Sequence, residues 1–380
     1  MKKSITVMGS TGSVGTSTVD LLKRSPELFD VEALTANKNV DLLAQQAIEL
    51  NAKMAVVADK KAYNDLKNAL SGKDIEVAAG EEALLEAAAR PADQVMAAIV
   101  GFAGLAPTLT AIKRGATILL ANKEALVCAG DLMVEEVRKN NATLLPVDSE
   151  HNAIFQVFDF DNKFGIDHIT LTASGGPFRC FTKQEMETVT PQQALAHPNW
   201  DMGAKISIDS ATMMNKGLEL IEAAYLFGLP EDRIKVLIHP QSIIHSTVSY
   251  IDGSVLAQLG DPDMRTPIAC ALAWPERMKT PVKQLDLAEI SKLTFETPDH
   301  DKFPALEIAR EALRNHKTIV FNAANEIAVE AFLQKRMSFL GISELVEKAV
   351  CTFDEIDINS LETVKMVDAE VRNWSRAQIN

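Results

Sequence analysis

The most constraining feature of this chain is a glycine-rich turn that joins a short apolar run to a helical pattern near its start. Residues 5–8 are apolar, Gly9, Gly12 and Gly15 follow at three-residue spacing, and residues 14–23 have helical periodicity. Glycines in this context let a backbone approach a pyrophosphate, which then lies at the N-terminus of the helix. The motif favours a nucleotide-binding turn, and the alternative is a tight strand–helix turn without a ligand.

This turn opens a long alternation of strand and helix patterns. The predicted strands are residues 5–8, 31–35, 54–58, 75–79, 95–100, 117–121 and 143–147, and the predicted helices are 14–23, 40–50, 83–89 and 125–139. Strands that are apolar throughout are expected where helices cover both faces of a parallel sheet. Residues 1–148 are therefore predicted to form a Rossmann-like nucleotide-binding domain of the α/β class.

The pattern changes after residue 148. Strands with alternating polarity are predicted at 166–173 and 243–250, a hairpin turn at 251–254 into 255–259, and one long helix at 210–227. We expect an α+β catalytic domain with an antiparallel sheet at 149–274 and a proline-rich linker at 275–304. Helical patterns at 305–314, 319–335, 343–353 and 360–374 predict an all-helical domain at 305–380.

Composition excludes several classes of protein. With 47% hydrophobic residues the chain is too apolar to be mainly disordered, and its longest nearly uncharged apolar run, 95–106, is too short to span a membrane. The N-terminal apolar stretch is too short for a signal peptide and the four cysteines are dispersed, so we expect reduced thiols in the cytoplasm. A net charge of −14 argues against nucleic-acid and membrane partners.

The end of the second predicted strand indicates which cofactor the turn would bind. An NAD-binding domain usually has Asp or Glu there, about 20 residues after the glycines, to bind the ribose hydroxyls. Here the sequence is Asn37, Lys38 and Asn39, without a carboxylate. A lysine between asparagines suits a 2′-phosphate, so we predict NADP(H).

Two carboxylates follow the last strand of the first domain. Asp148 and Glu150 are two residues apart, and an extended backbone would point both to the same side. Carboxylates that converge repel one another unless a cation or a shared proton intervenes. A helix that begins here, with Asp148 as its N-cap and Glu150 in its first turn, explains the pair equally well.

A second polar cluster lies at the start of the predicted long helix. Its members able to donate hydrogen bonds to a phosphate are Ser207, Ser210, Asn215 and Lys216. Glu219 follows Asn215 by four residues and would be a third oxygen ligand beside Asp148 and Glu150. An all-oxygen set suits Mg²⁺ or Mn²⁺. An ordinary amphipathic surface helix is the alternative.

Two loops complete the candidate residues. Trp200 lies in a Pro- and Gly-bounded loop that starts at His197, and we interpret this loop as a lid with Gly203 near its hinge; a surface loop is the alternative. Ser174 precedes two glycines and a proline, which makes it either a ligand or part of a simple turn. His151, His239 and His245 have no spaced partner and are interpreted as structural, whereas His300 and His316 carry no signal.

These residues together resemble the 1-deoxy-D-xylulose 5-phosphate reductoisomerase family. The segments that carry the resemblance are 9–15, 121–125, 146–156, 173–178, 197–203, 206–219, 260–267 and 322–326. They span essentially the whole chain and occur in the order found in the family. One position departs from it, because Asn37 stands where many members have a glycine beside the lysine.

The resemblance implies a role for each matching residue. NADPH contacts are implied for Thr11, Gly12, Ser13, Val14, Lys38, Asn39, Asn122, Glu124 and Gly203, with Asn37 beside them. Ligands of Mg²⁺ or Mn²⁺ are implied for Asp148, Glu150 and Glu219. Substrate-binding and catalytic positions are implied for Lys123, Ser149, Ser174, His197, Ser210, Asn215 and Lys216, and Trp200 and Met264 match residues that cover the substrate.

The resemblance also implies a reaction. A divalent metal acts as a Lewis acid on a sugar phosphate, a retro-aldol cleavage and aldol union rearrange its carbon skeleton, and NADPH reduces the resulting aldehyde. The substrate would be 1-deoxy-D-xylulose 5-phosphate and the product 2-C-methyl-D-erythritol 4-phosphate, in non-mevalonate isoprenoid synthesis. A homodimer is implied, and an exposed edge of the middle-domain sheet is one interface for it.

Three other functions fit the residues without the resemblance. An NADP-dependent semialdehyde dehydrogenase would need a nucleophilic cysteine, and none of the four lies in such a context. A non-catalytic NADP-sensing module would bind nucleotide without needing a metal. A metal-dependent aldolase or isomerase that uses the nucleotide only structurally would turn over without oxidising NADPH.

Overall fold

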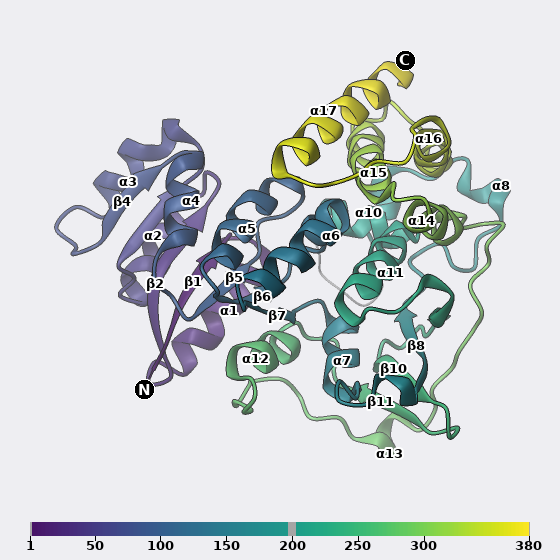
Figure 1. Ribbon diagram of the computed structural model, residues 1–380, viewed down its shortest axis with the longest axis horizontal. Helices are drawn as coiled ribbons and strands as arrows, with labels where there is room; N and C mark the ends of the chain where they lie inside the picture. The colour runs from purple at the N-terminus through teal and green to yellow at the C-terminus, as the bar shows by residue number, and fades with distance from the viewer. Residues whose placement is uncertain (1, 197–202, 380) are drawn as a thin grey trace. The chain divides into compact units, whose positions relative to one another are not determined.

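The computed structural model describes residues 2–196 and 203–379 (Figure 1). The chain forms two compact units. The first unit contains residues 1–125, 133–152 and 263–282, and the second contains residues 126–132, 153–262 and 283–380. Each unit therefore combines segments that are distant in sequence. The four-part division into 1–148, 149–274, 275–304 and 305–380 stays a prediction.

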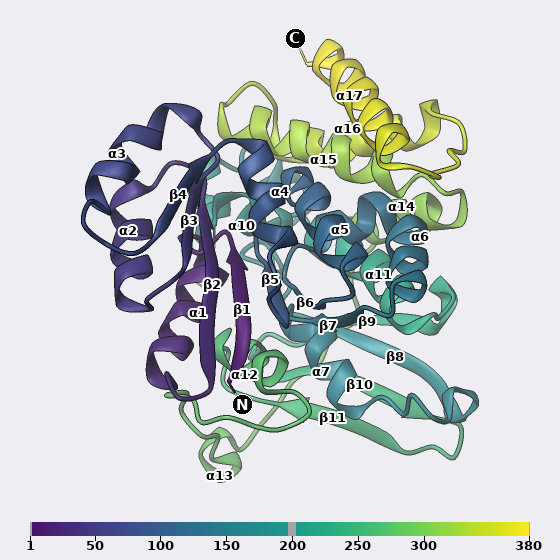
Figure 2. The same cartoon turned by 60° about the vertical axis from the view of Figure 1, so that its left-hand side comes forward.

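A seven-stranded parallel sheet forms the centre of the first unit (Figure 2). Its strands are β1 (Lys3–Met8), β2 (Phe29–Ala36), β3 (Met54–Val57), β4 (Glu76–Ala79), β5 (Gln94–Ala97), β6 (Thr117–Leu120) and β7 (Thr143–Pro146). The order is β4-β3-β2-β1-β5-β6-β7, so the chain reverses its direction across the sheet after β4. All seven predicted strands and the α/β class are confirmed.

Helices cover both faces of this sheet. They are α1 (Ser13–Arg24), α2 (Val40–Glu49), α3 (Tyr63–Ala69), α4 (Glu81–Ala89), α5 (Leu105–Lys113), α6 (Lys123–Lys139) and α12 (Arg265–Ala273), with 3₁₀ turns η1 (Lys60–Ala62) and η2 (Phe102–Gly104). Right-handed crossovers place α1, α2 and α3 on one face and, because the direction reverses, α4 and α5 on the other. The alternation therefore places the carboxyl ends of the strands at one edge, where such sheets bind ligands.

The fifth strand is shorter than predicted. The apolar pattern extends to residue 100, but β5 ends at Ala97. Gly9 has φ +86°, and a Cβ there would lie 2.7 Å from the carbonyl oxygen of Ala98. The backbone after β5 thus passes directly over the glycine turn, and the chain leaves the sheet at that point.

The second unit has a four-stranded sheet in the order β11-β10-β8-β9. Its strands are β8 (Ile166–Ala173), β9 (Ile234–Ile238), β10 (Ile244–Tyr250) and β11 (Val255–Leu259). The predicted hairpin between β10 and β11 is confirmed, since the Tyr250 N–H donates to the Ser254 carbonyl at 2.8 Å. The expectation of a purely antiparallel sheet was wrong, because β9, which has no clear alternation, pairs in parallel with β8.

The single long helix predicted at 210–227 is two helices. α10 (Ala204–Ala211) ends at Thr212, and α11 (Met214–Phe227) begins after Met213. Met213 has φ +63°, in the left-handed region that a non-glycine residue rarely adopts. The helical periodicity continues through the break, which is why the sequence does not reveal it.

A hydrophobic core holds the sheet of the second unit against α7 (Ser149–Val157) and α11. Phe158 and Phe227 have ring centroids 5.1 Å apart, and Leu171 and Val248 of the sheet are fully buried in the same cluster. Truncating one such phenylalanine to alanine typically costs about 3–5 kcal/mol. The core therefore fixes the C-terminal part of α11 to the sheet.

The remaining elements are mostly helical, as predicted. They are α8 (Lys183–Met186), α9 (Pro191–Leu195), α13 (Leu287–Ile290), α14 (Ala305–Arg314), α15 (Thr318–Leu333), α16 (Phe339–Thr352) and α17 (Leu361–Gln378), with 3₁₀ turns η3 (Lys163–Gly165) and η4 (Glu231–Arg233). The four predicted helices after residue 304 are confirmed. Among residues 2–196 and 203–379, no helix has both the length and the apolarity needed to cross a bilayer.

Candidate functional site

The glycine turn between β1 and α1 has the geometry of an anion-binding loop. α1 begins at Ser13 with no side-chain hydrogen bond at its N-cap, Gly12, and no acidic residue in its first turn. The Gly9 N–H donates a hydrogen bond to the Thr35 Oγ1 at 2.9 Å. A Cβ on Gly15 would overlap the backbone of Gly9 and Ser10, so only glycine fits there. A helix N-terminus of this kind, approached by bare backbone, fits the pyrophosphate of a dinucleotide.

The residues proposed to bind the 2′-phosphate follow β2 at the same edge of the sheet. Asn37, Lys38 and Asn39 are exposed, and the Asn39 side chain caps α2 by accepting a hydrogen bond from the Leu42 N–H at 3.3 Å. A carboxylate at the end of β2 would repel a 2′-phosphate, and none is present at residues 35–40. The position therefore suits NADPH better than NADH.

Asn122 and Glu124 begin α6, directly after β6. The Asn122 side chain is buried, accepts from the Ala125 N–H at 3.2 Å and donates to the Gly101 carbonyl at 2.9 Å. It thus ties the start of α6 to the segment after β5. Thr11 lies in the glycine turn, and Ser13 and Val14 are the first two residues of α1, so the first unit brings these implied NADPH contacts to one edge of its sheet.

The start of α6 also carries Lys123, which forms an ion pair with Asp148, the residue after β7 and Val147. Both side chains are about nine-tenths buried. Burial raises the pKa of Asp148, but the positive field of Lys123 and His151, a hydrogen bond shared with the Glu150 carboxyl group and one donated by Lys123 outweigh it, and the pKa lies far below its ordinary value. Asp148 is therefore ionised at neutral pH, as a metal ligand must be.

Glu150 lies in the first turn of α7, so of the two local conformations that the sequence left open, the structure has the helix and not the extended backbone. A carboxylate oxygen of Glu150 nevertheless lies within 4.8 Å of one from Asp148. Ser149 donates a hydrogen bond to Glu150 at 2.5 Å. Two adjacent carboxylates with oxygen donors fit Mg²⁺ or Mn²⁺. That Glu219 of the second unit joins Asp148 and Glu150 as a third metal ligand stays a prediction.

The second unit gathers the predicted phosphate-binding residues around the break between α10 and α11. Lys216 and Glu219 are both buried and form an ion pair one turn apart on α11. Lys216 also donates to the Thr172 carbonyl at 2.5 Å, and Asn215 donates to Glu219. A surface helix would leave these side chains in water, so the amphipathic-helix alternative does not describe this cluster.

The turn after β8 lies against the same break. Ser174 accepts a hydrogen bond from the Gly176 N–H at 3.2 Å. A Cβ on Gly176 would lie 2.8 Å from the Ser210 carbonyl oxygen and 3.1 Å from the Ala211 Cα. Ser174 and Ser210, distant in sequence, are therefore brought together by the close approach of a glycine. Ser207 is buried and donates to the Gly203 carbonyl at 3.1 Å, which makes it a helix-internal residue.

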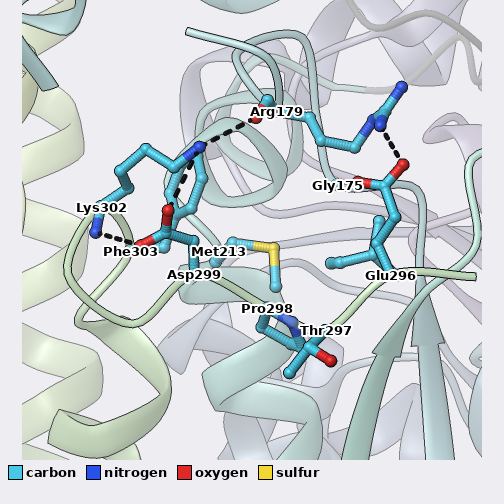
Figure 3. A pocket seen from close by; sticks show the side chains of 10 residues that line it. Gly175, Arg179, Met213, Glu296, Thr297, Pro298, Asp299, Lys302 and Phe303 are labelled. Atoms are coloured by element: carbon cyan, nitrogen blue, oxygen red, sulfur yellow. Dashed lines mark hydrogen bonds and ion pairs between the residues drawn. The ribbon is translucent and has the colours of Figure 1, made fainter. Parts of the chain in front are cut away.

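A polar cavity of about 210 Å³ lies beside this turn (Figure 3). Gly175 and Met213 line it, and Figure 3 shows Arg179 reaching Glu296, with which it forms an ion pair. Lys302 donates to the Arg179 carbonyl at 3.1 Å. Both cations at this cavity therefore bond to groups of the protein itself.

Four further predicted positions complete the set. His197 and Trp200 lie outside the described residues, so the lid is an expectation only. Gly203 is exposed and is the N-cap of α10. Met264, the N-cap of α12, is half-buried in the first unit.

The sequence reasoning missed a buried acid in the middle of the second cluster. Asp209 is 1% exposed and accepts hydrogen bonds from Lys205 and Asn325, each at 2.8 Å. The spacing of Lys205 and Asp209, four residues apart on one helix, was a readable signal of an ion pair. The hydrogen bond from Asn325, which lies 116 residues later, left no signal in the sequence.

The comparisons with known proteins cover almost the whole chain. Models of 1-deoxy-D-xylulose 5-phosphate reductoisomerase and of its C-terminal domains match residues 5–130, 144–227 and 259–374. The 1-deoxy-D-xylulose 5-phosphate reductoisomerase of Rhodospirillum centenum is 56% identical over 99% of this chain and 94% of that protein. The one from Zymomonas mobilis is 56% identical over 97% of this chain and 96% of that protein.

Solved structures agree. The Zymomonas mobilis enzyme in complex with NADPH has a TM-score of 0.96 at 53% identity and covers all of both chains. A DOX-P reductoisomerase in complex with NADPH, fosmidomycin and magnesium has a TM-score of 0.95 at 44% identity, over 99% of this chain and 98% of that one. With the nucleotide turn and the two acidic clusters described above, these matches show that the chain belongs to the 1-deoxy-D-xylulose 5-phosphate reductoisomerase family.

Proposed function

We propose that this chain converts 1-deoxy-D-xylulose 5-phosphate to 2-C-methyl-D-erythritol 4-phosphate, with NADPH and a divalent metal, in isoprenoid synthesis. The observation that carries the proposal is the buried Lys216–Glu219 pair beside Ser174 and Ser210. It offers cationic and hydroxyl donors to a phosphate in a chain whose net charge is −14. Family membership supplies the identity of the reaction.

The first unit is proposed to hold the nicotinamide cofactor. The open N-terminus of α1 would take the pyrophosphate, and Lys38 would pair with the 2′-phosphate at the exposed end of β2. Asn122 and Glu124 at the start of α6 would contact the nicotinamide half. NADPH then supplies the hydride that reduces an aldehyde to an alcohol.

Asp148, Glu150 and Glu219 are proposed to hold one Mg²⁺ or Mn²⁺. Such a cation supplies Lewis acidity toward the substrate's carbonyl and hydroxyl oxygens. Lys123 keeps Asp148 ionised and is proposed to move a proton or stabilise negative charge near the carbonyl. This chemistry would serve a retro-aldol cleavage and aldol union that rearrange the carbon skeleton before reduction.

The substrate's phosphate is proposed to bind where α10, α11 and the Ser174 turn meet. Lys216 provides the charge, and Ser174, Ser210 and Asn215 provide neutral hydrogen bonds. Each of these residues is buried or half-buried, so its side chain loses little conformational entropy when the phosphate binds. His197, Trp200 and Met264 are proposed to complete and cover the site, with Gly203 near the hinge.

A homodimer in the cytoplasm is proposed. The edge strand β11 leaves Val255 and Leu259 on one face and Leu256 on the other exposed by 59%, 36% and 49%, so a second copy that pairs with this edge would cover apolar side chains on both faces. The described cysteines form no disulfide, as expected in a reducing compartment. Analytical ultracentrifugation of Leu256→Lys tests the interface: a monomer is expected, and an unchanged dimer would place the interface elsewhere.

The reaction is tested by NADPH oxidation with 1-deoxy-D-xylulose 5-phosphate, in the presence of Mn²⁺, of Mg²⁺ and of a chelator. Oxidation that needs both the sugar phosphate and a metal is expected. Oxidation that persists in chelator would contradict the metal assignment. No oxidation by folded protein that binds NADPH would contradict the substrate. Product analysis then separates a reductoisomerase from an aldolase or isomerase, which would consume substrate without oxidising NADPH.

A further inference from the structure

A buried carboxylate connects the helical tail to the phosphate-binding helix. Asp209 of α10 is 1% exposed, and Asn325 of α15 is fully buried. The Asn325 Nδ2 donates to the Asp209 Oδ1 at 2.8 Å. An ionised carboxylate taken out of water needs partners of this kind, because an unpaired buried charge is strongly destabilising. The bond therefore ties two elements that are 116 residues apart.

The ion pair between Lys205 and Asp209 does not by itself connect α10 to another element. Lys205 donates to the other carboxylate oxygen at 2.8 Å, but it lies on α10 itself, one turn earlier. An ion pair within one helix neutralises charge without fixing that helix against a neighbour. Asn325 comes from a different helix and carries no charge. Its contribution is thus positional, while that of Lys205 is electrostatic.

The position of α10 matters for the proposed phosphate site. Ser210 directly follows Asp209, and its carbonyl oxygen is the atom against which Gly176 packs. A shift of α10 would move Ser210 and, through that contact, the turn that carries Ser174. Misplacing a binding group by about 1 Å can cost on the order of 100-fold in rate.

We propose that Asn325 is a positioning residue, which acts through Asp209 to place Ser210 and Ser174 for the substrate's phosphate. The inference rests on the proposed function. It also gives a role to segment 322–326, which the proposed chemistry does not use. The same segment offers a matched control, because Asn322 is equally buried but bonds to Cys128 and Glu326 instead of α10.

The test compares Asn325→Leu with Asn322→Leu in the full chain. Asn325→Leu is expected to raise KM for 1-deoxy-D-xylulose 5-phosphate roughly tenfold or more, with kcat within about threefold and NADPH affinity unchanged. Asn322→Leu should lower thermal stability similarly and leave KM unchanged. An unchanged KM in Asn325→Leu, or an equal rise in Asn322→Leu, overturns the proposal.

The Asp209→Asn variant distinguishes the positional effect of the Asn325 hydrogen bond from the effect of the negative charge on residue 209. An amide at residue 209 retains a hydrogen bond to Asn325 but loses the ion pair with Lys205, so KM should stay within about threefold of wild type. A rise as large as that of Asn325→Leu would assign the effect to charge and contradict the proposal. If Asn325→Leu does not fold, Asn325→Ser, too short to reach Asp209, takes its place. Wild-type turnover tests the proposed function separately.

Discussion

Lys123 and Asp148 form a buried ion pair although each follows a different strand of the parallel sheet. β6 ends just before the α6 helix that begins at Lys123, and β7 ends just before Asp148. Neighbouring parallel strands end at the same edge, so their first following residues meet there. The pair explains how a carboxylate that burial would neutralise stays ionised and available to a cation.

Replacing Asp148 with Asn should weaken metal binding. The change removes one proposed ligand charge and leaves Lys123 buried without its carboxylate partner. We expect the Mn²⁺ concentration for half-maximal activity to rise by about 10- to 100-fold, with NADPH affinity within twofold. Activity titrated with Mn²⁺ and NADPH fluorescence measure the two effects. Unchanged metal dependence would remove Asp148 from the ligand set.

Glu219→Gln should reduce turnover severely and affect NADPH binding less. Glu219 is buried and is held by Lys216 and Asn215, so an amide keeps its shape but lowers the charge offered to a cation. We expect kcat to fall by at least about 100-fold. Single-turnover kinetics with saturating Mn²⁺ provide the measurement. Turnover at the wild-type rate would exclude Glu219 as a metal ligand.

Lys38→Ala should reduce the preference for NADPH over NADH. Lys38 is exposed just after β2, and residues 35–40 contain no carboxylate. Loss of one charge-assisted contact to the 2′-phosphate is expected to raise KM for NADPH about tenfold and to leave KM for NADH unchanged. Equal effects on both cofactors would show that Lys38 does not contact that phosphate.

How much the sequence reveals differs between the two units. The parallel sheet follows from strands that are apolar on both faces, and its seven strands were predicted within a few residues. The carboxylates and lysines were selected as candidates from their types and spacing, each with a structural alternative, and their roles came from the family resemblance. The left-handed Met213, the parallel pairing of β9 and the Asn325–Asp209 bond were not predictable, because each depends on contacts between distant segments or on a backbone angle that leaves no periodicity.

Acid should destabilise the first unit through Glu32. Burial raises the pKa of this 4%-exposed carboxyl, but hydrogen bonds from Lys53 and Arg90 outweigh it, and the pKa lies below its ordinary value. A lowered pKa in the folded state means that the unfolded state binds more protons, so this stability is present above about pH 4 and is lost as pH falls through the folded-state pKa.

Glu32→Gln tests this pH dependence. The variant should unfold at a lower denaturant concentration at pH 7, by about 1–3 kcal/mol, because two charge-assisted hydrogen bonds are weakened. The difference from wild type should shrink as the pH is lowered below 4. Denaturation followed by fluorescence at both pH values measures it. A difference that is the same at pH 7 and at low pH would mean that Glu32 titrates normally.

Gly176→Ala should disturb the proposed phosphate site, and Gly253→Ala is its matched control. Both glycines have a left-handed backbone, with φ +66° and +89°, so alanine strains each by about 1 kcal/mol. Only at Gly176 does the added Cβ also meet backbone, 2.8 Å from the Ser210 carbonyl oxygen, whereas nothing lies within 4 Å at Gly253. The clash must separate the Ser174 turn from α10. We expect KM for the sugar phosphate to rise at least about tenfold in Gly176→Ala and to stay unchanged in Gly253→Ala. Steady-state kinetics measure KM for both variants, and thermal melts show whether each is equally stable. Equal KM values would mean that the contact between Gly176 and Ser210 does not shape the phosphate site.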